Sequence, residues 1–218
     1  MPRLLPSAAE VREAAERLRG VAVRTPLRRS AALSELAGGD VYLKLESEQL
    51  TGSFKMRGAF NVLSQLTPEE RAQGVVASSA GNHGLGIAES AQRLGIAATI
   101  FVPSNAPDVK KQGIAQRGAR VTDEAADYDD AMVRAREFAR QANTTFVHPC
   151  LGVPLLAGQG TVASEVLDEL PSLQTMLVCV GGGGLLGGVG AFLLGEAPQV
   201  RVVGVQSERT DAMARAIE

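Results

Sequence analysis

Hydrophobic and polar positions follow two alternating patterns along most of this 218-residue chain. Short apolar runs bounded by glycine or polar residues predict buried strands, and apolar residues three and four apart predict helices. In the middle of the chain, strands are expected at 74–79, 97–102, 119–122 and 144–147. Helices between them are expected at 82–94, 108–117 and 127–141. Strands separated by helices of this length indicate parallel βαβ units, so residues 76–150 are predicted to form a small α/β domain.

The segments on either side of this block continue the same patterns. Upstream, a helix is expected at 7–19 with Ser7 as its N-cap, a strand at 41–47, and a helix at 53–66 that stops near Pro68. Downstream, helices are expected at 154–169, from a glycine turn to about 194, and at 207–218, with strands at 175–180 and 201–206. Residues 1–75 and 151–218 are thus predicted to form a second, larger parallel-sheet α/β domain. Because the chain ends inside a βα unit, this larger domain is expected to be incomplete.

Composition and charge exclude several classes of function. Charged residues make up 21% of the chain and the net charge is -2, so no basic surface for nucleic acid is expected. Residues 175–195 are uncharged, but they contain Gly181–Gly184, and each glycine in a helix interior costs roughly 1 kcal/mol relative to alanine. We therefore predict no membrane span. Acidic residues near the N-terminus argue against a secretory signal, and a cytoplasmic protein is predicted.

Two cysteines and two histidines are the only residues of these types in the chain: Cys150, Cys179, His83 and His148. Neither pair has the spacing of a zinc site or of a disulfide framework. We interpret the cysteines as reduced thiols, with Cys179 in the core because it alternates with apolar neighbours in a predicted strand. His148 is interpreted as a hydrogen-bonded residue at a strand end.

The motif TGSFKMRGAFN, residues 51–61, places Lys55 at the start of a helix among small and apolar neighbours. A lysine in this position is usually a solvated charge. Burial, however, lowers the pKa of a lysine and makes its amine a nucleophile that can form a Schiff base with a carbonyl cofactor. Spacing alone does not decide between these two interpretations.

The motif SSAGNHGLG, residues 78–86, lies at a predicted strand-to-helix junction. The free N–H groups of the first helical turn form an anion site there, and Ser79, Asn82 and His83 add side-chain donors. The structural alternative is a capped helix, with Asn82 or Ser79 as the cap. Both interpretations are compatible, because a capping loop can also hold a carboxylate.

The motif VGGGGLLGG, residues 180–188, places four glycines between a strand and a helix. Glycines let the backbone approach an anion closely, and a phosphate is the natural ligand of such a turn. The alternative is a dinucleotide site, since Gly182, Gly184 and Gly187 fit the pattern G-x-G-x-x-G. That pattern is weak when it stands alone and late in the chain.

These three motifs, in this order, resemble the threonine dehydratase and serine racemase group of pyridoxal phosphate (PLP) enzymes, which have the tryptophan-synthase-β-like fold. The resemblance rests on six segments, namely RTPL at Arg24, YLKLE at Tyr42, GSFKMRGA at Gly52, SAGNHG at Ser79, AGQGT at Ala157 and GGGGLLGG at Gly181. It implies two α/β domains with PLP in the cleft between them.

The resemblance also implies a role for each motif. Lys55 would hold PLP as a Schiff base and move protons at the substrate α-carbon, with Phe54 beside the cofactor ring and Asn82 on its hydroxyl. The phosphate would bind the backbone N–H groups of Gly181, Gly182, Gly183, Gly184 and Leu185. The substrate carboxylate would bind the loop of Ser79, Ala80, Gly81 and His83.

Four departures from the family limit these expectations. Serine racemases have a second serine where this chain has Ala80, so dehydration is favoured over racemisation. The segment HPCLG at 148–152 lacks the aromatic and acidic residues often found there, which leaves the substrate open. Gln206 stands where some relatives have a metal-binding glutamate, so no metal site is predicted. Relatives are also longer, and exposed apolar surface is expected where the larger domain is incomplete.

The predicted function is PLP-dependent deamination of L-threonine or L-serine by α,β-elimination, which yields a 2-keto acid and ammonia. The partner is a small amino-acid substrate, and the full-length form is expected to be a homo-oligomer. Two alternatives stay open: a truncated, non-catalytic remnant that binds PLP or another phosphate, and a serine racemase-like enzyme. NAD-dependent oxidoreduction has only the glycine pattern in its favour.

Overall fold

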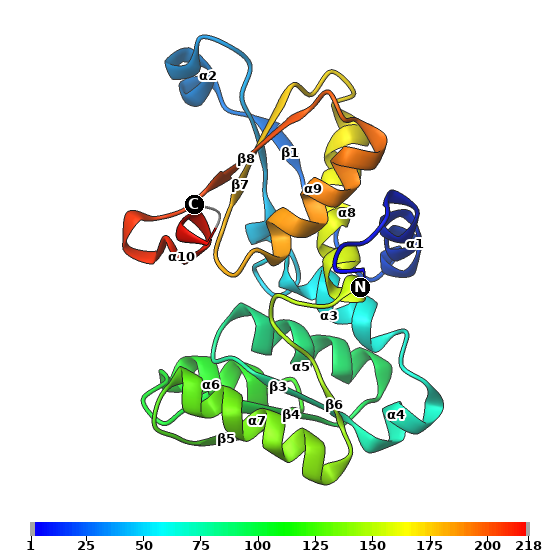
Figure 1. Cartoon of the computed structure of the whole chain (residues 1–218), viewed down its shortest axis with the longest axis vertical. Coiled ribbons are helices and arrows are strands. Elements are labelled where there is room, and N and C mark those ends of the chain that lie inside the picture. The colour runs from blue at the N-terminus through cyan, green and yellow to red at the C-terminus, as the bar shows by residue number, and fades with distance from the viewer. Residues whose placement is uncertain (1–2, 217–218) are drawn as a thin grey trace.

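The computed structural model describes residues 3–216, and Figure 1 shows its arrangement. The lower part of Figure 1 contains a four-stranded parallel sheet in the order β5-β4-β3-β6. Its strands are β3 (Val75–Ser78), β4 (Ala98–Pro103), β5 (Arg120–Ala125) and β6 (Thr145–Phe146). The helices that connect them are α5 (Asn82–Leu94), α6 (Asp108–Ala115) and α7 (Tyr128–Ala142).

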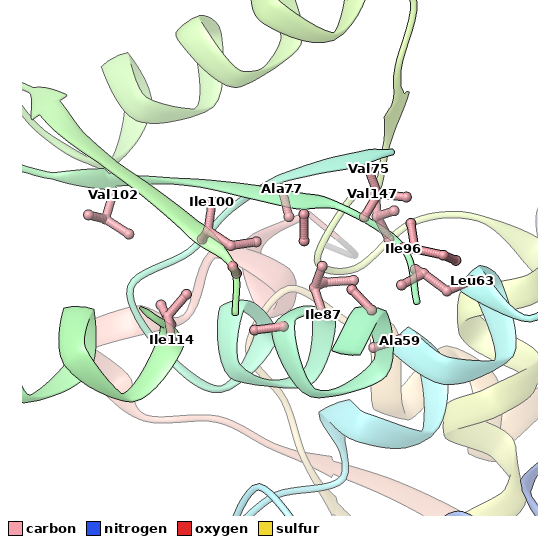
Figure 2. Close-up of a cluster of buried hydrophobic side chains, with 14 of the residues drawn as sticks. Ala59, Leu63, Val75, Ala77, Ile87, Ile96, Ile100, Val102, Ile114 and Val147 are labelled. Atoms are coloured by element: carbon pink, nitrogen blue, oxygen red, sulfur yellow. The ribbon is translucent and has the colours of Figure 1, made fainter. Parts of the chain in front are cut away.

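Strand alternation explains how this sheet packs on both faces. Successive side chains of a strand point to opposite faces, so Val75 and Ala77 face one way and Val76 the other. Val75 and Ala77 belong to a buried cluster with Ile87 of α5, which Figure 2 shows between the sheet and the helices beneath it. Val76 packs instead with Ala135 and the other buried alanines of α7. The sheet is therefore covered by helices on both faces, as parallel sheets usually are.

Most of the remaining elements form the upper part of Figure 1, whereas the short helix Pro68–Gln73 lies in the lower part. Before the four-stranded sheet come α1 (Ala8–Leu18), β1 (Leu27–Arg29), α2 (Ala31–Ala37), β2 (Tyr42–Lys44), the short 3₁₀ helix η1 (Glu46–Glu48), α3 (Lys55–Leu63) and α4 (Pro68–Gln73). After it come α8 (Val153–Glu169), β7 (Thr175–Cys179), α9 (Gly184–Glu196), β8 (Arg201–Val205), η2 (Glu208–Thr210) and α10 (Ala212–Arg215). β1 and β2 pair antiparallel, whereas β7 and β8 pair in parallel.

The α/β class with a parallel-sheet core is confirmed, and so is the cap at Ser7, which forms a capping box with Glu10. Three predicted elements differ from the structure. The strand expected at 41–47 is only Tyr42–Lys44, because η1 begins at Glu46. Pro68 starts a new helix, since proline is tolerated in the first helical turn and Thr67 caps that helix. The helix expected at 207–218 consists of η2 and the four residues of α10, and residues 217–218 lie outside the described part.

The division into residues 1–75, 76–150 and 151–218 stays a prediction. Within residues 3–216, no helix is both long and apolar enough to cross a membrane. The outer face of the β7–β8 pair carries exposed apolar side chains, including Leu177 and Val205. Cys179 lies on this strand pair and is exposed, so its predicted place in the core is wrong. Alternation along β7 is real, but only one face of the pair is covered by helices.

Glycines bring the backbones of α3, α8 and α9 into close contact. A β-carbon at Gly158 of α8 would lie 2.6 Å from the Arg57 carbonyl oxygen of α3. One at Gly188 of α9 would lie 2.2 Å from the Leu156 carbonyl oxygen of α8. Side chains at these positions would push the helices apart, so α8 connects the start of α3 to α9 through backbone contacts.

Candidate active site

Lys55 is the first residue of α3. Helix α5 crosses close to it, because a β-carbon at Gly86 would lie 3.1 Å from the Lys55 carbonyl carbon. The Lys55 amine, Nζ, donates a hydrogen bond to the Pro149 carbonyl oxygen at 2.7 Å and lies 5.5 Å from the centre of the Phe54 ring. Burial lowers the pKa of Lys55, although the electrostatic interaction with Cys150 opposes this. Lys55 is therefore a partly buried lysine rather than a solvated one.

A cavity of about 100 Å³ joins Lys55 to the glycine turn. Its lining residues are Phe54, Lys55, Cys150, Cys179 and Gly181–Leu185. The turn follows β7 and leads into α9, whose first N–H groups have no partner within the helix. Gly183 has φ +81°, a conformation that favours glycine, and a β-carbon at Gly182 would lie 2.5 Å from Cys150 Sγ. The turn therefore exposes backbone donors where side chains do not fit, as an anion site requires.

The loop from Ser79 to His83 does not line this cavity. It connects β3 to α5, and Gly81 rather than Ser79 or Asn82 is the N-cap residue, without a side-chain cap. The predicted cap is therefore wrong. Ser79 Oγ instead accepts the Gly81 N–H at 3.1 Å within the loop, and Asn82 is the exposed first residue of the helix. Ala80 is half-buried and packs against the hydrophobic cluster that includes Ile87.

His83 is buried, with 3% of its surface exposed. Its Nε2 lies 3.1 Å from the Val147 carbonyl oxygen. Burial lowers the pKa of His83 to about 3, and the nearby charge of Lys55 lowers it further, while the bond to Val147 opposes both. The ring is therefore neutral at physiological pH. Its predicted contact with a substrate carboxylate could come only through the backbone N–H, because the ring is not accessible.

Residues Val147–Leu151, which we call the wall segment, connect the loop, Lys55 and the glycine turn. The Val147 carbonyl contacts His83, and the Pro149 carbonyl accepts the bond from Lys55. His148 Nδ1 accepts the backbone N–H groups of Cys150 and Leu151 at 3.1 and 3.0 Å. This agrees with the interpretation of His148 as a hydrogen-bonded strand-end residue. Sequence patterns did not indicate a role for Cys150, and a thiol beside a glycine turn has no periodic signature.

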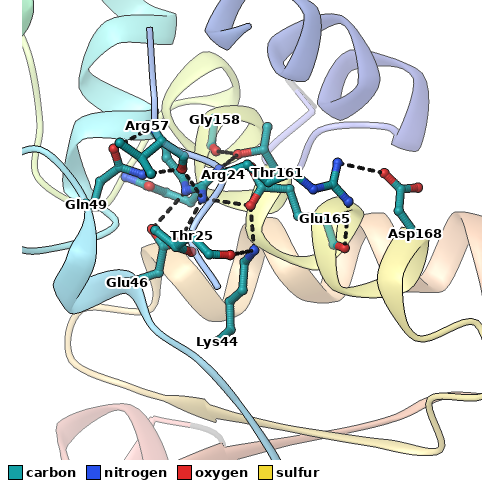
Figure 3. Close-up of polar contacts among 12 residues, drawn as sticks. Arg24, Thr25, Lys44, Glu46, Gln49, Arg57, Gly158, Thr161, Glu165 and Asp168 are labelled. Carbon is teal, nitrogen blue, oxygen red and sulfur yellow. Dashed lines mark hydrogen bonds and ion pairs between the residues drawn. The ribbon is translucent and has the colours of Figure 1, made fainter. Parts of the chain in front are cut away.

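A buried ionic network surrounds Arg57, two residues after Lys55, as Figure 3 shows. Arg57, which is 1% exposed, donates to Glu46 at 2.7 and 2.8 Å and to Glu165 at 2.7 and 3.0 Å. Burial opposes the charge of Arg57, but the hydrogen bonds and charges of the two carboxylates outweigh it and raise its pKa. Lys44 Nζ adds an ion pair to Glu165 at 2.7 Å, and Thr25 Oγ1 donates to Glu46 at 2.6 Å.

This network gives several of the sequence motifs a structural meaning. Thr25 comes from RTPL, Lys44 and Glu46 from YLKLE, and Arg57 from GSFKMRGA. Thr161 of AGQGT lies 3.2 Å from Arg57 Nη1. The motifs outside the cavity thus fix the first turn of α3, the turn that carries Lys55. The charged residues of these motifs were the only sequence signal for the network. No spacing rule predicts that segments so far apart in the sequence come into contact.

Comparisons with known proteins agree with this geometry. Residues 18–218 match the family model described as pyridoxal-phosphate dependent enzyme. The L-threonine ammonia-lyase of Thermotoga maritima is 44% identical over 204 residues, which cover 94% of this chain and 51% of that protein. The L-threonine dehydratase catabolic TdcB of Staphylococcus aureus is 41% identical over 209 residues, 95% of this chain and 60% of that protein. The crystal structure of serine racemase from Dictyostelium discoideum superposes with a TM-score of 0.91 and 32% identity, over 97% of this chain and 69% of that one.

The chain therefore belongs to the family of pyridoxal-phosphate dependent enzymes. The predicted family and the cofactor PLP are confirmed. The chain spans between about half and three-fifths of the length of these two curated relatives. The residues present also fit PLP, because a partly buried amine and a row of backbone donors that line one cavity suit an aldehyde and a phosphate.

Residues 3–216 contain no cluster of three or more histidine, cysteine, aspartate or glutamate side chains that could hold a metal ion. The side chain of Gln206 is hydrogen-bonded to the backbone. It donates to the Gly181 carbonyl at 3.4 Å and accepts from the Ala214 N–H at 3.2 Å. The absence of a metal site stays a prediction.

Proposed function

We propose that this chain carries the cofactor site of a PLP-dependent enzyme that deaminates L-threonine or L-serine by α,β-elimination. The products are a 2-keto acid and ammonia. The observation that carries the proposal is the cavity in which the Lys55 amine faces the glycine turn at Gly181–Leu185. The relatives named threonine ammonia-lyase and threonine dehydratase support this choice of reaction.

PLP supplies an electron sink for the bond that breaks at the substrate α-carbon. The protein supplies binding, orientation and proton transfer. Because burial lowers the pKa of Lys55, more of its amine is neutral at a given pH than in an exposed lysine, and a neutral amine can accept the α-proton. The N–H groups that begin α9 would hold the phosphate, and Phe54, which lines the same cavity, would lie beside the ring.

The start of α5 is the proposed site for the substrate carboxylate. Gly81 has no side-chain cap, so the first N–H groups of α5, at Asn82 and His83, are available to an anion. The helix dipole favours a negative charge at the same end. Asn82 is exposed at this end, and we assign it to the cofactor hydroxyl.

Racemisation is the second candidate, since a solved neighbour is a serine racemase. A racemase needs a proton donor on each face of the substrate α-carbon. Ala80 offers a methyl group where serine racemases have a serine, so only the Lys55 face has a proton-transfer group. We expect keto acid to form from L-serine without D-serine. Efficient interconversion of L- and D-serine would overturn this role of Ala80.

Titration with PLP tests the cofactor site directly. The protein should acquire the visible absorbance of PLP bound covalently to an amine, and the Lys55→Ala variant should lose it. The chain has four lysines, so Lys110→Ala, which removes an exposed amine, is the matched control and should retain the signal. An unchanged signal in Lys55→Ala would refute the assignment of Lys55.

Keto acid release from L-threonine and L-serine tests the reaction. Production that depends on Lys55 supports deamination. Covalent PLP binding without any keto acid from either substrate would instead support the non-catalytic remnant, a candidate that the partial length relative to known enzymes keeps open.

A further inference from the structure

We propose that His83 is a positioning residue whose imidazole holds the wall segment against the cavity through the Val147 carbonyl. The substrate carboxylate is then left to the backbone of the same loop. This inference rests on the proposed function only in treating the cavity as the PLP site.

The hydrogen bond from His83 defines the tautomer of the ring. A carbonyl oxygen can only accept, so Nε2 must carry the proton in the 3.1 Å contact with Val147. Nδ1 is then a bare acceptor, and within residues 3–216 it has no hydrogen-bond partner. A histidine that is buried and bonded at one nitrogen to the backbone can orient that backbone, but it has no accessible group for a substrate.

The wall segment begins where strand pairing ends. The last pairing bond with β3 joins the Val147 N–H to the Val76 carbonyl at 2.8 Å, and β6 itself ends at Phe146. The Val147 carbonyl therefore leaves the ladder at the start of the wall segment, and His83 fixes its direction from the first turn of α5.

Two contacts at the cavity depend on the direction in which the chain leaves Val147. Two residues beyond Val147, the Pro149 carbonyl accepts the bond from Lys55 Nζ at 2.7 Å. The next residue, Cys150, packs against the glycine turn, where a β-carbon at Gly184 would lie 3.2 Å from its α-carbon. A shift of the wall segment would therefore move the acceptor of Lys55 and open the contact with the turn.

Two substitutions separate this role from simple core packing. In His83→Gln the amide nitrogen can take the place of imidazole Nε2 and still donate to Val147. In His83→Asn the shorter side chain reaches only the place of Nδ1, so the bond to Val147 is lost. The readout is the alkylation rate of Cys150 by iodoacetamide in the protein without PLP, resolved by peptide mass spectrometry. Cys179, the only other cysteine, is an internal reference in the same cavity.

We expect His83→Asn to raise the Cys150 rate about tenfold, the factor that corresponds to about 1.4 kcal/mol for one buried hydrogen bond. The Cys179 rate should change less than about twofold, and His83→Gln should restore the Cys150 rate to within about threefold of the wild type. Ser90→Ala is the matched control, because Ser90 is buried on the same helix and donates to the Gly86 carbonyl instead of the wall segment. It should lower the Tm without raising the Cys150 rate.

The proposal is overturned if His83→Asn leaves the Cys150 rate unchanged, if Ser90→Ala raises it equally, or if His83→Gln fails to restore it. Should His83→Asn not fold, ¹⁵N NMR of the wild-type imidazole decides, since the proposal requires the Nε2–H tautomer between pH 5 and pH 8. None of these measurements needs PLP. A wild-type protein that binds no PLP would refute the proposed function and leave this result standing.

Discussion

Lys55 and Arg57 are two cations in the first turn of one helix, and their surroundings differ sharply. Arg57 points into the network of Figure 3, where two carboxylates and Thr161 take up its donors. Lys55 points into the cavity, where it has one neutral carbonyl as a hydrogen-bond acceptor. Burial works against the charge of both residues, but the pKa of Arg57 is raised and that of Lys55 is lowered.

The difference shows what each cation can do. A buried charge that is fully paired is stable and unreactive, because removing its proton would leave its partners unpaired. A buried amine without a carboxylate partner is destabilised in its charged form, and its lone pair becomes available for chemistry. The same helical turn thus contains a structural anchor, Arg57, and a candidate nucleophile, Lys55. Measurements of stability can distinguish these two roles.

The largest expected effect comes from removing the paired cation. Arg57→Met should lower the free energy of unfolding by about 3–5 kcal/mol, because the partly buried Glu46 and Glu165 would lose their fully buried main partner. Lys55→Met, the matched change two residues earlier, should lower it by less than about 1 kcal/mol or raise it. Urea denaturation measures both. Equal losses in the two variants would contradict the contrast between anchor and nucleophile.

The next effect concerns His83, the buried base beside Lys55. Its pKa is about 3 in the folded protein against 6.5 in the unfolded chain, so the unfolded chain binds more protons between these values. Stability is thus fully present above pH 6.5 and is lost as the pH falls toward 3. Between pH 7 and pH 5 the wild type should lose about 2 kcal/mol more than His83→Gln, as measured by urea unfolding at each pH. Parallel pH profiles would show that His83 titrates normally.

A smaller effect is expected at the glycine turn. Gly182→Ala should lower the free energy of unfolding by about 1 kcal/mol, the lower end of the range for overpacked sites. The cost is low because the obstructing atom is the end of the Cys150 side chain. Gly181→Ala, which meets nothing within 4 Å, should change stability by less than about 0.5 kcal/mol. The double variant Gly182→Ala with Cys150→Ala should recover most of the loss in thermal unfolding. Failure to recover it would place the strain elsewhere.

The smallest effect is expected at the rim of the ionic network. Arg24 pairs with Glu169 at 3.1 Å and Asp168 at 3.5 Å, but its side chain is half exposed. Exposed pairs are screened by water and salt, so Arg24→Ala should cost only about 0.2–1 kcal/mol, and less at high salt. Chemical denaturation at low and high ionic strength would check this. A cost comparable to that of Arg57→Met would mean that burial does not separate the rim from the centre of the network.

Sequence patterns predicted the parallel strands, the connecting helices and the two ends of the cavity. Periodicity sufficed because the strands β3 to β5 and the helices α5 to α7 are long enough to show it. It missed β1, with three residues, and α2, with seven, because so short an element barely repeats its pattern. Cys179 was misplaced because alternation identifies two faces of a strand and not which face is covered.

The contacts of the wall segment and of the ionic network could not be predicted from the sequence, for a different reason. The bond from Lys55 to Pro149 joins residues 94 positions apart, and that from Arg57 to Glu165 joins residues 108 apart. No local pattern encodes such pairs. The prediction that Asn82 or Ser79 caps α5 was wrong for a related reason. A β-carbon at Gly84 would lie 2.2 Å from the Ser79 carbonyl oxygen. That close approach fixes the loop more firmly than the capping preference of Asn82.

The glycine contacts among α3, α8 and α9 have a practical consequence for anyone who wishes to redesign this site. The spacing between the amine end and the anion end is set by main chains in contact, at Gly158 and Gly188, and not by side-chain rotamers. Exchanging residues that line the cavity should therefore alter its width and polarity while the reach from one end to the other stays constant. A library that varies the cavity should therefore leave these two glycines untouched, together with the wall segment, whose Pro149 carbonyl holds Lys55.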